Sequence, residues 1–227
     1  AATLWGHRPQ LNSSEWCGSW KLFWPDGQSM THDQCPMATA VKERRPIRGL
    51  EAIAERPDGT RVPFIPFPTP IFDSAGQFVG AVNLLVDISD RKQAEEAMGR
   101  LAAIVESSDD AIIEKTLDGI ITSWNKGAEI VFGYLAQKII GKSVKILIPI
   151  EYQKEEETIL DRLRRGQHIE HYETVRQRKH GSRINVSLTI SPIRSASGQI
   201  MGASKVARDI TDRKRTEAQL VLLGREA

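Results

Sequence analysis

Apolar and polar residues alternate along this chain with two different periods. Val186, Leu188 and Ile190 are separated by single polar residues, which is the period of a strand with one buried face. Ile159 and Leu163 lie four residues apart in a charged segment, which is typical of a helix with one apolar face. The pattern therefore predicts both strands and amphipathic helices.

Two long segments repeat each other at a constant offset of 122 residues. Residues 56–98 match residues 178–220 without a gap. The identical positions include Gly59/Gly181, Arg61/Arg183, Pro70/Pro192, Gly76/Gly198, Gly80/Gly202, Asp87/Asp209, Ile88/Ile210 and Arg91/Arg213. The chain is therefore predicted to be a tandem of two related domains.

Each copy of the repeat predicts three antiparallel strands followed by a helix. Asp58-Gly59 and His180-Gly181 are tight-turn dipeptides, and a second turn containing Gly follows each of them after one strand. The last strand leads into Asp-Ile-Ser or Asp-Ile-Thr, where Ser89 or Thr211 is expected to cap the following helix. A helix should therefore leave the sheet at the same point in both copies.

The second copy carries further elements before these strands. Residues 111–114 and 119–124 predict two short strands, and residues 127–132, 136–140 and 154–165 predict helices. Two strands, short helices and three strands form an α+β unit with a five-stranded antiparallel sheet.

The first copy lacks this opening. Its Leu4-Trp5-Gly6 matches Val131-Phe132-Gly133, so two N-terminal strands of the first domain are expected to precede Ala1. We assign the first domain to residues 1–89, a linker helix to 90–106, the second domain to 107–212 and a C-terminal signalling helix to 213–227.

The linker helix carries one apolar stripe. Met98, Leu101, Ile104 and Val105 follow each other at helical spacing, and the C-terminal helix has a similar but shorter stripe. A parallel coiled coil between two protomers and packing against the sheet of the same domain both fit this pattern.

Composition excludes several classes of protein. The 227 residues are 40% hydrophobic and 26% charged, a globular profile, with a formal net charge of +2. Such a small net charge gives no excess of basic residues of the kind that binds nucleic acid or an anionic membrane. No apolar run approaches the roughly 20 residues that span a bilayer. Only Cys17 and Cys35 occur and no signal peptide is visible, so we expect a cytoplasmic segment.

Several spaced motifs of the second copy resemble the PAS family with its trailing S-box. They are DGIITSWNKGAEIVFGY at 118–134, IGKSV at 140–144, LIP at 147–149 and DITDRK at 209–214. Trp5-Gly6 and residues 56–92 are similar to the same family. The first copy is similar to a subgroup common in bacterial sensor kinases, and residues 220–227 resemble the segment before the phosphate-accepting His in the HWE-type kinase group.

The resemblance implies a module that binds a small molecule between sheet and helices, or binds nothing and serves dimerisation and signal relay. A ligand space would lie against the inner face of the second sheet, and a filled core at the same positions is the alternative. The candidate lining residues are Ile130, Phe132, Ile146, Ile159, Leu163, Val186, Leu188 and Ile190.

The resemblance also allows known cofactors to be weighed. Haem-binding members have an axial His on the long helix, where this chain has Glu156, and a carboxylate is a poor substitute for imidazole on haem iron. His168 and His171 are interpreted as residues of a solvated loop and strand edge. Light-sensing flavin members need a Cys after Gly133, which residues 142–150 lack. Haem on this helix and a covalent flavin adduct are therefore not expected in the second domain; non-covalent flavin binding stays open.

Other candidate sites have simpler interpretations. Cys17, His32 and Cys35 offer only three metal ligands and are interpreted as a packed loop rather than a metal site. Trp124 is expected in the core or at an interface rather than stacked on flavin, and the carboxylate run at 155–157 is expected on a solvated helix face. The remaining tryptophans, expected in the core or at interfaces, are Trp5, Trp16, Trp20 and Trp24.

The chain contains no phosphate-binding loop, nucleophile elbow or Cys-x-x-Cys pair, so this fragment is not expected to be an enzyme. We interpret it as a tandem-PAS sensor segment, homodimeric, that signals to a C-terminal histidine kinase which phosphorylates itself from ATP; its ligand stays unknown. The residues expected to relay the signal are Asp87, Asp209, Ile210, Thr211 and Arg213. The alternative is a ligand-free PAS scaffold for protein interactions with another output.

Overall fold

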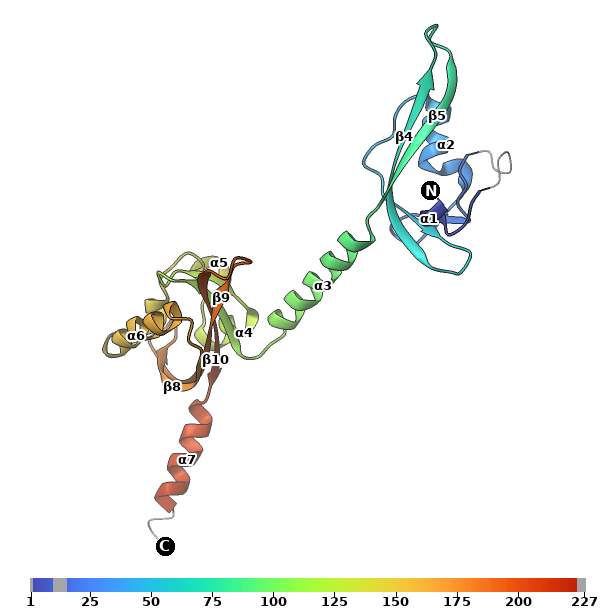
Figure 1. Cartoon of the computed structure of the whole chain (residues 1–227). Coiled ribbons are helices and arrows are strands. Elements are labelled where there is room, and N and C mark those ends of the chain that lie inside the picture. The colour runs from blue at the N-terminus through green and yellow to red at the C-terminus, as the bar shows by residue number, and fades with distance from the viewer. Residues whose placement is uncertain (1, 10–15, 224–227) are drawn as a thin grey trace. The chain divides into compact units, whose positions relative to one another are not determined.

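The computed structural model describes residues 2–9 and 16–223 (Figure 1). The chain divides into two compact units, residues 1–99 and 100–227. Each unit has its own five-stranded antiparallel sheet, as the α+β prediction required. The division falls within helix α3, Ser89–Glu106, which overlaps the predicted linker helix.

The second unit has the sheet order β7-β6-β10-β9-β8. Its strands are β6 (Ala111–Thr116), β7 (Ile121–Trp124), β8 (Ile169–Gln177), β9 (Arg183–Arg194) and β10 (Ile200–Asp209). The segments between β7 and β8 are α4 (Lys126–Phe132), α5 (Ala136–Ile139), the 3-10 turns η2 (Val144–Leu147) and η3 (Ile150–Tyr152), and α6 (Gln153–Arg164). Helix α7 (Thr211–Leu223) follows β10, and residues 224–227 of the predicted signalling helix lie outside the described part.

The period of two in the sequence accounts for this core. Ile184, Val186, Leu188 and Ile190 occupy alternate positions of β9 and are buried, while the residues between them are partly exposed. Helix α4 begins where the Asn125 side chain accepts a hydrogen bond from the backbone N–H of Ala128 at 2.9 Å. The inner face of the sheet and the helices thus enclose one apolar core.

The first unit contains the repeated strands in the same order. They are β3 (Ala52–Glu55), β4 (Arg61–Phe72) and β5 (Phe78–Asp87), preceded by α1 (Ala2–Trp5), the 3-10 turn η1 (His32–Gln34) and α2 (Pro36–Glu43). Pro66, Pro68 and Pro70 fall where β4 has β5 as its only paired neighbour, so their missing N–H groups leave β3 unaffected.

Two further strands join the first sheet, at a place that we did not expect. Strands β1 (Lys21–Phe23) and β2 (Ser29–Met30) form a hairpin that pairs with β3, giving the order β2-β1-β3-β4-β5. The free edge of β5 is the position that β6 occupies beside β10 in the second unit. Within the described residues, β5 pairs with β4 alone.

We call α3 and α7, which leave the two sheets, the exit helices. Their caps differ from the prediction. The side chains of Asp87 and Asp209 accept the backbone N–H groups of Ser89 and Thr211, each at 2.9 Å. The Thr211 hydroxyl instead accepts the backbone N–H of Asn185 on β9 at 3.0 Å. The aspartates therefore cap the helix starts, and Thr211 ties α7 to the sheet.

Candidate functional site

The predicted pocket residues of the second unit form a packed core, with one exception. Phe132, Ile159, Leu163, Val186, Leu188 and Ile190 are buried together, and Ile146 packs against them while partly exposed. Ile130 was assigned wrongly, because it is 68% exposed. The face of α4 that turns inward carries Gly127, Ala128, Val131 and Phe132 instead.

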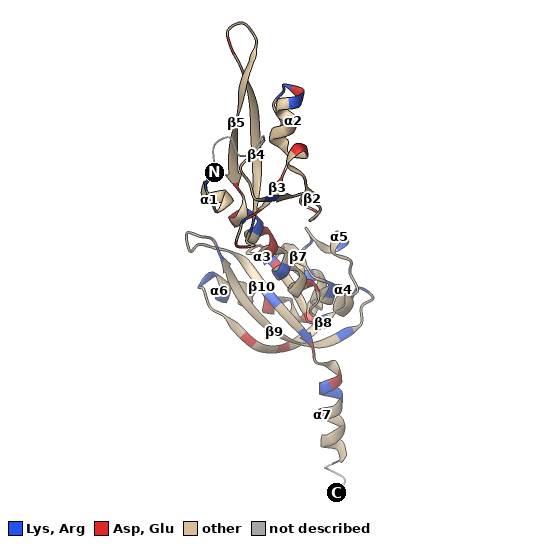
Figure 2. Cartoon of the chain, turned by 90° about the vertical axis from the view of Figure 1, so that its right-hand side faces the viewer, with Lys and Arg blue, Asp and Glu red and all other residues tan. Residues whose placement is uncertain are grey.

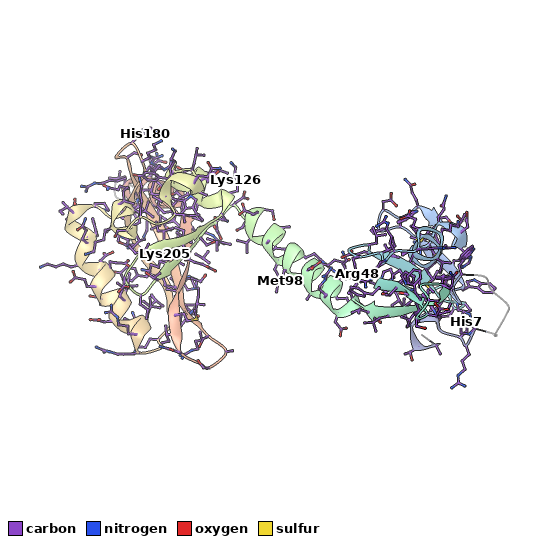
Figure 3. All side chains as sticks on the ribbon, turned by 90° about the horizontal axis from the view of Figure 1, so that it is seen from above. His7, Arg48, Met98, Lys126, His180 and Lys205 are labelled. Carbon is purple, nitrogen blue, oxygen red and sulfur yellow. The ribbon has the colours of Figure 1, made fainter. Side chains whose placement is uncertain are left out.

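A cluster of charged side chains lies in the same core. We call Lys115, Glu156, Arg176 and Lys205 the ionic cluster. Each of these residues is at most 3% exposed. Glu156 projects from α6, whereas Lys115, Arg176 and Lys205 come from β6, β8 and β10. Lys205 is labelled in Figure 3. The cluster therefore connects the long helix to three strands of the sheet.

Glu156 is the centre of this cluster. Its Oε1 atom contacts the ammonium group of Lys115, and its Oε2 atom lies 3.8 Å from Nζ of Lys205. The expectation of a solvated carboxylate run is thus wrong for Glu156, which is fully buried, although Glu157 is exposed. The reason is that two lysines on the inner face of the sheet supply the opposite charge.

Arg176, the remaining member of the cluster, has hydrogen-bond partners of its own. Its Nη1 atom donates to Glu155 Oε2 at 3.1 Å, to Thr174 Oγ1 at 3.0 Å and to the carbonyl of Val175 at 2.7 Å. Thr174 Oγ1 in turn donates to Glu155 Oε2 at 2.8 Å. The Nε and Nη2 atoms of Arg176 make no hydrogen bond within the part of the chain that the structure describes.

Burial controls the protonation of the cluster. Desolvation, reinforced by the nearby charge of Lys115, lowers the pKa of Lys205 to about 7. Desolvation also lowers the pKa of Lys115, against the attraction of Glu156. Burial would raise the pKa of Glu156, but Lys205 and Lys115 outweigh it and lower that pKa. The cluster thus holds a carboxylate and a lysine that titrates near neutrality.

A second arrangement fastens the exit helix to the sheet. Glu173 on β8 contacts Arg213, and its Oε2 atom lies 2.5 Å from Nζ of Lys214 in the first turn of α7. The hydrogen bond from Lys214 is the main reason that the pKa of Glu173 is lowered. We call this set the exit clamp.

The first unit has the same clamp at the repeated positions. Glu51 lies 2.6 Å from Nη2 of Arg91 and 2.7 Å from Nζ of Lys92 on α3. Glu51 and Glu173 are themselves related by the offset of 122. Arg213 was among the expected relay residues, but the two glutamates were not, because they lie before the repeat segments 56–98 and 178–220.

The other expected relay residues surround this clamp. Asp209 Oδ2 lies 2.9 Å from Nη2 of Arg178, and hydrogen bonds from Thr211 together with this ion pair lower the pKa of Asp209 despite its burial. Ile210 is buried and donates its backbone N–H to the carbonyl of Asn185 at 2.9 Å. Asp87 caps α3 as described above.

A pocket lies beside each clamp. In the second unit a pocket of about 290 Å³ is lined by Tyr152, Glu155, Glu173, Thr174, Val175, Asn185, Ile210 and Lys214. In the first unit a pocket of about 320 Å³ is lined by Pro25, Glu51, Ala52, Ile53, Arg61, Pro63, Lys92 and Glu96. Only the pocket of the second unit shares residues with the ionic cluster and its partners, namely Glu155 and Thr174.

The cysteine segment of the first unit forms a hydrogen-bonded loop. Ser19 Oγ lies 3.1 Å from Cys17 Sγ and 3.2 Å from His32 Nε2, and Cys35 Sγ accepts the N–H of Ala38 at the start of α2. A hydrogen bond from Cys35 is the main cause that lowers the pKa of Cys17 to about 6. No group of three potential metal ligands occurs among the described residues.

The remaining candidates have local roles. Trp124 is buried and donates to the carbonyl of Tyr134 at 3.0 Å. His168 is exposed and lies 3.0 Å from Glu170 Oε1, and His171 occupies the exposed part of β8. Trp5 is buried, and Trp16 and Trp24 pack against the core of the first unit. Trp20 is exposed, so of its two expected places, core and interface, the core does not apply.

Comparison with protein families identifies both units. The family described as PAS fold matches residues 99–210, and the family described as PAS domain matches residues 19–90. The chain is a tandem of two PAS domains. These PAS domains are similar to parts of known signalling proteins.

Three such relatives belong to two-component signal transduction or sensing by name. Two-component system protein A of Emericella nidulans is 40% identical over 105 residues, covering 45% of this chain and 15% of the relative. The sensor protein FixL of Bradyrhizobium diazoefficiens is 27% identical, covering 66% and 31%. The signal transduction histidine-protein kinase AtoS of Escherichia coli is 26% identical, covering 76% and 26%. The chain thus spans less than a third of each relative.

Solved structures include other PAS domains. The PAS domain of a Colwellia psychrerythraea protein is 28% identical, with a TM-score of 0.45 over 51% of this chain and 98% of that one. An RNA-binding light-oxygen-voltage receptor is 12% identical, with a TM-score of 0.50 over 83% and 85%. The latter likeness concerns the fold alone. Among the described helices, none is both long and apolar enough to cross a membrane.

Proposed function

We propose that this chain is the cytoplasmic sensory and dimerisation segment of a sensor histidine kinase of the HWE type. Its PAS domains and its two-component relatives assign it to signal transduction. In the proposal, a small-molecule or redox signal in the second PAS domain changes the position of α7 and thereby controls a C-terminal kinase. The observation that carries this is the continuity from the ionic cluster through β10 to the exit clamp.

The path of the signal follows covalent and ionic connections. Lys205 lies on β10 only four residues before Asp209, which caps α7. The pocket beside the clamp is lined by Glu155 and Thr174, which bind Arg176, and also by Glu173 and Lys214. A ligand or proton that is bound more tightly in one position of α7 than in another would shift the equilibrium between them.

The exposed apolar residues of α3 and α7 support dimerisation. No residue of α3 or of the described part of α7 is buried. Leu101 is 65% exposed, and Met98 projects from α3 (Figure 3). Figure 2 shows charge in the first turn of α7 and an uncharged surface toward its end. A coiled coil between two protomers would bury the apolar stripe of α3.

The dimer is tested by placing charge in the stripe. Replacing Leu101 and Val105 by Lys should convert the dimer to monomers, measured by light scattering. Arg100→Lys, which changes a neighbouring residue without changing charge, serves as the control. A dimer that survives the double substitution would place the contact elsewhere.

A ligand-free scaffold is the second candidate function. The filled apolar core of the second PAS domain favours it, because Phe132, Leu163 and Leu188 pack together where a cofactor would otherwise lie. An absorption spectrum of the purified chain and mass spectrometry of the denatured supernatant separate the two functions. A bound small molecule supports sensing, and repeated empty preparations support the scaffold.

The kinase assignment is tested on the full-length parent. With labelled ATP, the parent should incorporate acid-labile phosphate on a His beyond Ala227, whereas residues 1–227 alone should not. A parent whose output is a cyclase or a DNA-binding domain would refute this assignment and leave the tandem of PAS domains unchanged.

A further inference from the structure

Both cysteines of the chain line one small cavity in the first PAS domain. Cys17 is partly exposed, whereas Cys35 is buried. Their side chains share a hydrogen bond in which the Cys35 thiol is the donor. The cavity has a volume of about 20 Å³, which is enough for one molecule of the size of water. The two side chains therefore lie against each other beside a space that only a very small reagent can enter.

The polar neighbours of Cys17 favour its thiolate form. Ser19 Oγ lies 3.1 Å from Cys17 Sγ, and Nε2 of His32 lies 3.1 Å from the carbonyl oxygen of Ser19. Because a carbonyl oxygen only accepts, Nε2 carries the hydrogen, and the Ser19 hydroxyl is left to donate to the sulfur. The hydrogen bond from Cys35, together with those from Ser19, lowers the pKa of Cys17 to about 6 despite its burial.

Cys35 is placed to react after Cys17 has been oxidised. In the reduced chain, the hydrogen bond to Cys17 and burial raise the pKa of Cys35. When Cys17 carries an oxygen atom and no charge, its thiolate no longer holds the proton of Cys35. The backbone N–H of Ala38, 3.4 Å from Cys35 Sγ at the start of α2, then favours the thiolate of Cys35.

A metal ion is the other partner that a pair of cysteines could bind. No group of three potential metal ligands occurs among residues 2–9 and 16–223, and Nε2 of His32 is bound to Ser19. Chemistry between the two sulfur atoms needs no further ligand, so it fits the arrangement better.

We propose that Cys17 and Cys35 form a reversible disulfide when the first PAS domain is exposed to hydrogen peroxide. The Cys17 thiolate attacks one oxygen of the peroxide, so that an S–O bond forms, the O–O bond breaks and the leaving hydroxide takes a proton from solvent. The sulfur of Cys35 then attacks the sulfur of Cys17. The S–S bond forms, the S–O bond breaks, and the departing hydroxide takes up the proton that Cys35 has lost.

In total, the two cysteines lose two electrons, and the peroxide is reduced to two molecules of water. A thiol reductant reverses the reaction by exchange with the disulfide. This site lies in the first PAS domain, so it is separate from the signal proposed for the second domain and does not depend on the kinase assignment.

The test is a peptide map of the full chain, because trypsin cleaves after Lys21 and separates the two cysteines. Cys17 then lies in the peptide 1–21 and Cys35 in the peptide 22–42. The reduced chain is treated with hydrogen peroxide, its remaining thiols are alkylated, and it is digested without reductant. The two peptides should be joined after peroxide treatment, separate in the untreated chain and separate again after dithiothreitol.

The wild-type chain also provides a control that needs no variant. The same treatment in urea removes the folded arrangement, and the two peptides should become joined several-fold more slowly there. Peptides that stay separate after peroxide treatment of the folded chain, or that become joined equally fast in urea, would overturn the proposal. A disulfide between two chains, detected by electrophoresis without reductant, would contradict it as well.

Variants separate the roles of the two cysteines. Cys35→Ser should leave Cys17 as a sulfenic acid that dimedone traps, whereas Cys17→Ser should leave the buried thiol of Cys35 unmodified. Ser19→Ala removes a donor to the Cys17 thiolate, so it should slow disulfide formation several-fold at pH 7 and move its pH profile upward. Ser29→Ala, on the exposed side of β2, should react like the wild-type chain. Equal rates and pH profiles for the two serine variants would show that the Ser19 hydroxyl does not activate Cys17.

Discussion

The two PAS domains share a clamp and a pocket but differ in the charge of their inner faces. Arg176 and Lys205 of the second domain stand where the first domain has Ala54 and Asn83. Both domains nevertheless form the same three repeated strands with the same pairing order. The charged core is therefore a feature of one domain and not a requirement of the fold.

The outer faces of the two sheets differ in how many apolar residues they carry, and here the first domain has more. On the outer face of β4 and β5 the first domain carries Ile65, Phe67, Val82, Leu84 and Val86. The counterparts in the second domain are Ser187, Thr189, Ser204, Val206 and Arg208. Figure 2 shows the paired stretch of β4 and β5 almost free of charge, and Leu84 is 64% exposed. The first domain thus exposes apolar residues, whereas the second buries charged ones.

The two domains are alike in their exit clamps. Glu51 and Glu173 bind equivalent Arg and Lys residues on helices that leave the sheets at equivalent points. The two exit helices are therefore attached to their sheets by equivalent ion pairs, although the cores of the two domains differ in charge.

The largest effect is expected from removing the central carboxylate. At pH 6, where Lys205 is protonated, Glu156→Gln leaves two buried lysines without a counter-charge and should lower the free energy of unfolding of the second domain by about 3–5 kcal/mol. Urea denaturation followed by circular dichroism measures this. Glu157→Gln, on the exposed part of the same helix, is the control. Equal midpoints for the two variants would contradict a central role of Glu156.

The next effect is a pH dependence confined to the charged domain. Lys205 has a pKa of about 7 in the folded state, against 10.5 for a free lysine. Between these values the unfolded chain binds more protons, so stability should rise with pH by at most about 1.4 kcal/mol per pH unit. Lys205→Asn introduces the residue of the first domain and should remove this contribution. Unchanged slopes from pH 7 to 9 would show that Lys205 keeps its proton.

Removing the glutamate of either exit clamp should have a smaller effect, and the effect should be the same in both domains. Glu51→Gln and Glu173→Gln should each increase hydrogen exchange in the first turn of the attached helix by roughly twofold to fivefold, because exposed ion pairs contribute little. Mass spectrometry of the exchanged chain measures both in one experiment. A response in only one of the two helices would show that the clamps have different roles.

The smallest effect concerns thiol reactivity in the first domain. Since the hydrogen bond from Cys35 lowers the pKa of Cys17 to about 6, alkylation of Cys17 by iodoacetamide should reach half its maximal rate near pH 6. In Cys35→Ser the midpoint should change, while Cys35 in the wild-type chain should react slowly because it is buried. A midpoint above pH 8 in the wild-type chain would contradict this arrangement.

The fold was largely predictable because its signals are local. The repeat and the turn dipeptides predicted the three shared strands, and alternation along β9 predicted the core residues Val186, Leu188 and Ile190. The β1–β2 hairpin was missed, although Asp26-Gly27 is a turn dipeptide of the same kind, between Leu22 and Met30. The repeat does not extend to that segment, so nothing predicted which strand it would join.

The candidate site was less accessible to sequence reasoning. Alternation does place Lys115 on the face of Ile113, and Lys205 on the face of Ala203 and Ala207. A charged residue in an otherwise apolar register was the available signal. Glu156, the partner of both lysines, lies on a helix that is distant in sequence from both strands. Only the tertiary structure reveals that its carboxylate meets the two lysines. Ile130 was misplaced for a related reason, since α4 is too short for its inward face to be assigned from spacing.

The coupling between the ionic cluster and α7 is tested most directly by nuclear magnetic resonance. We predict that the backbone amide signals of residues 210–214 titrate with a midpoint near pH 7 in the wild-type chain and lose this midpoint in Lys205→Asn, while residues 88–92 show no such change. A midpoint near pH 7 that persists in Lys205→Asn, or signals at 210–214 that do not respond to pH, would contradict the proposed connection between the charged core and the exit helix.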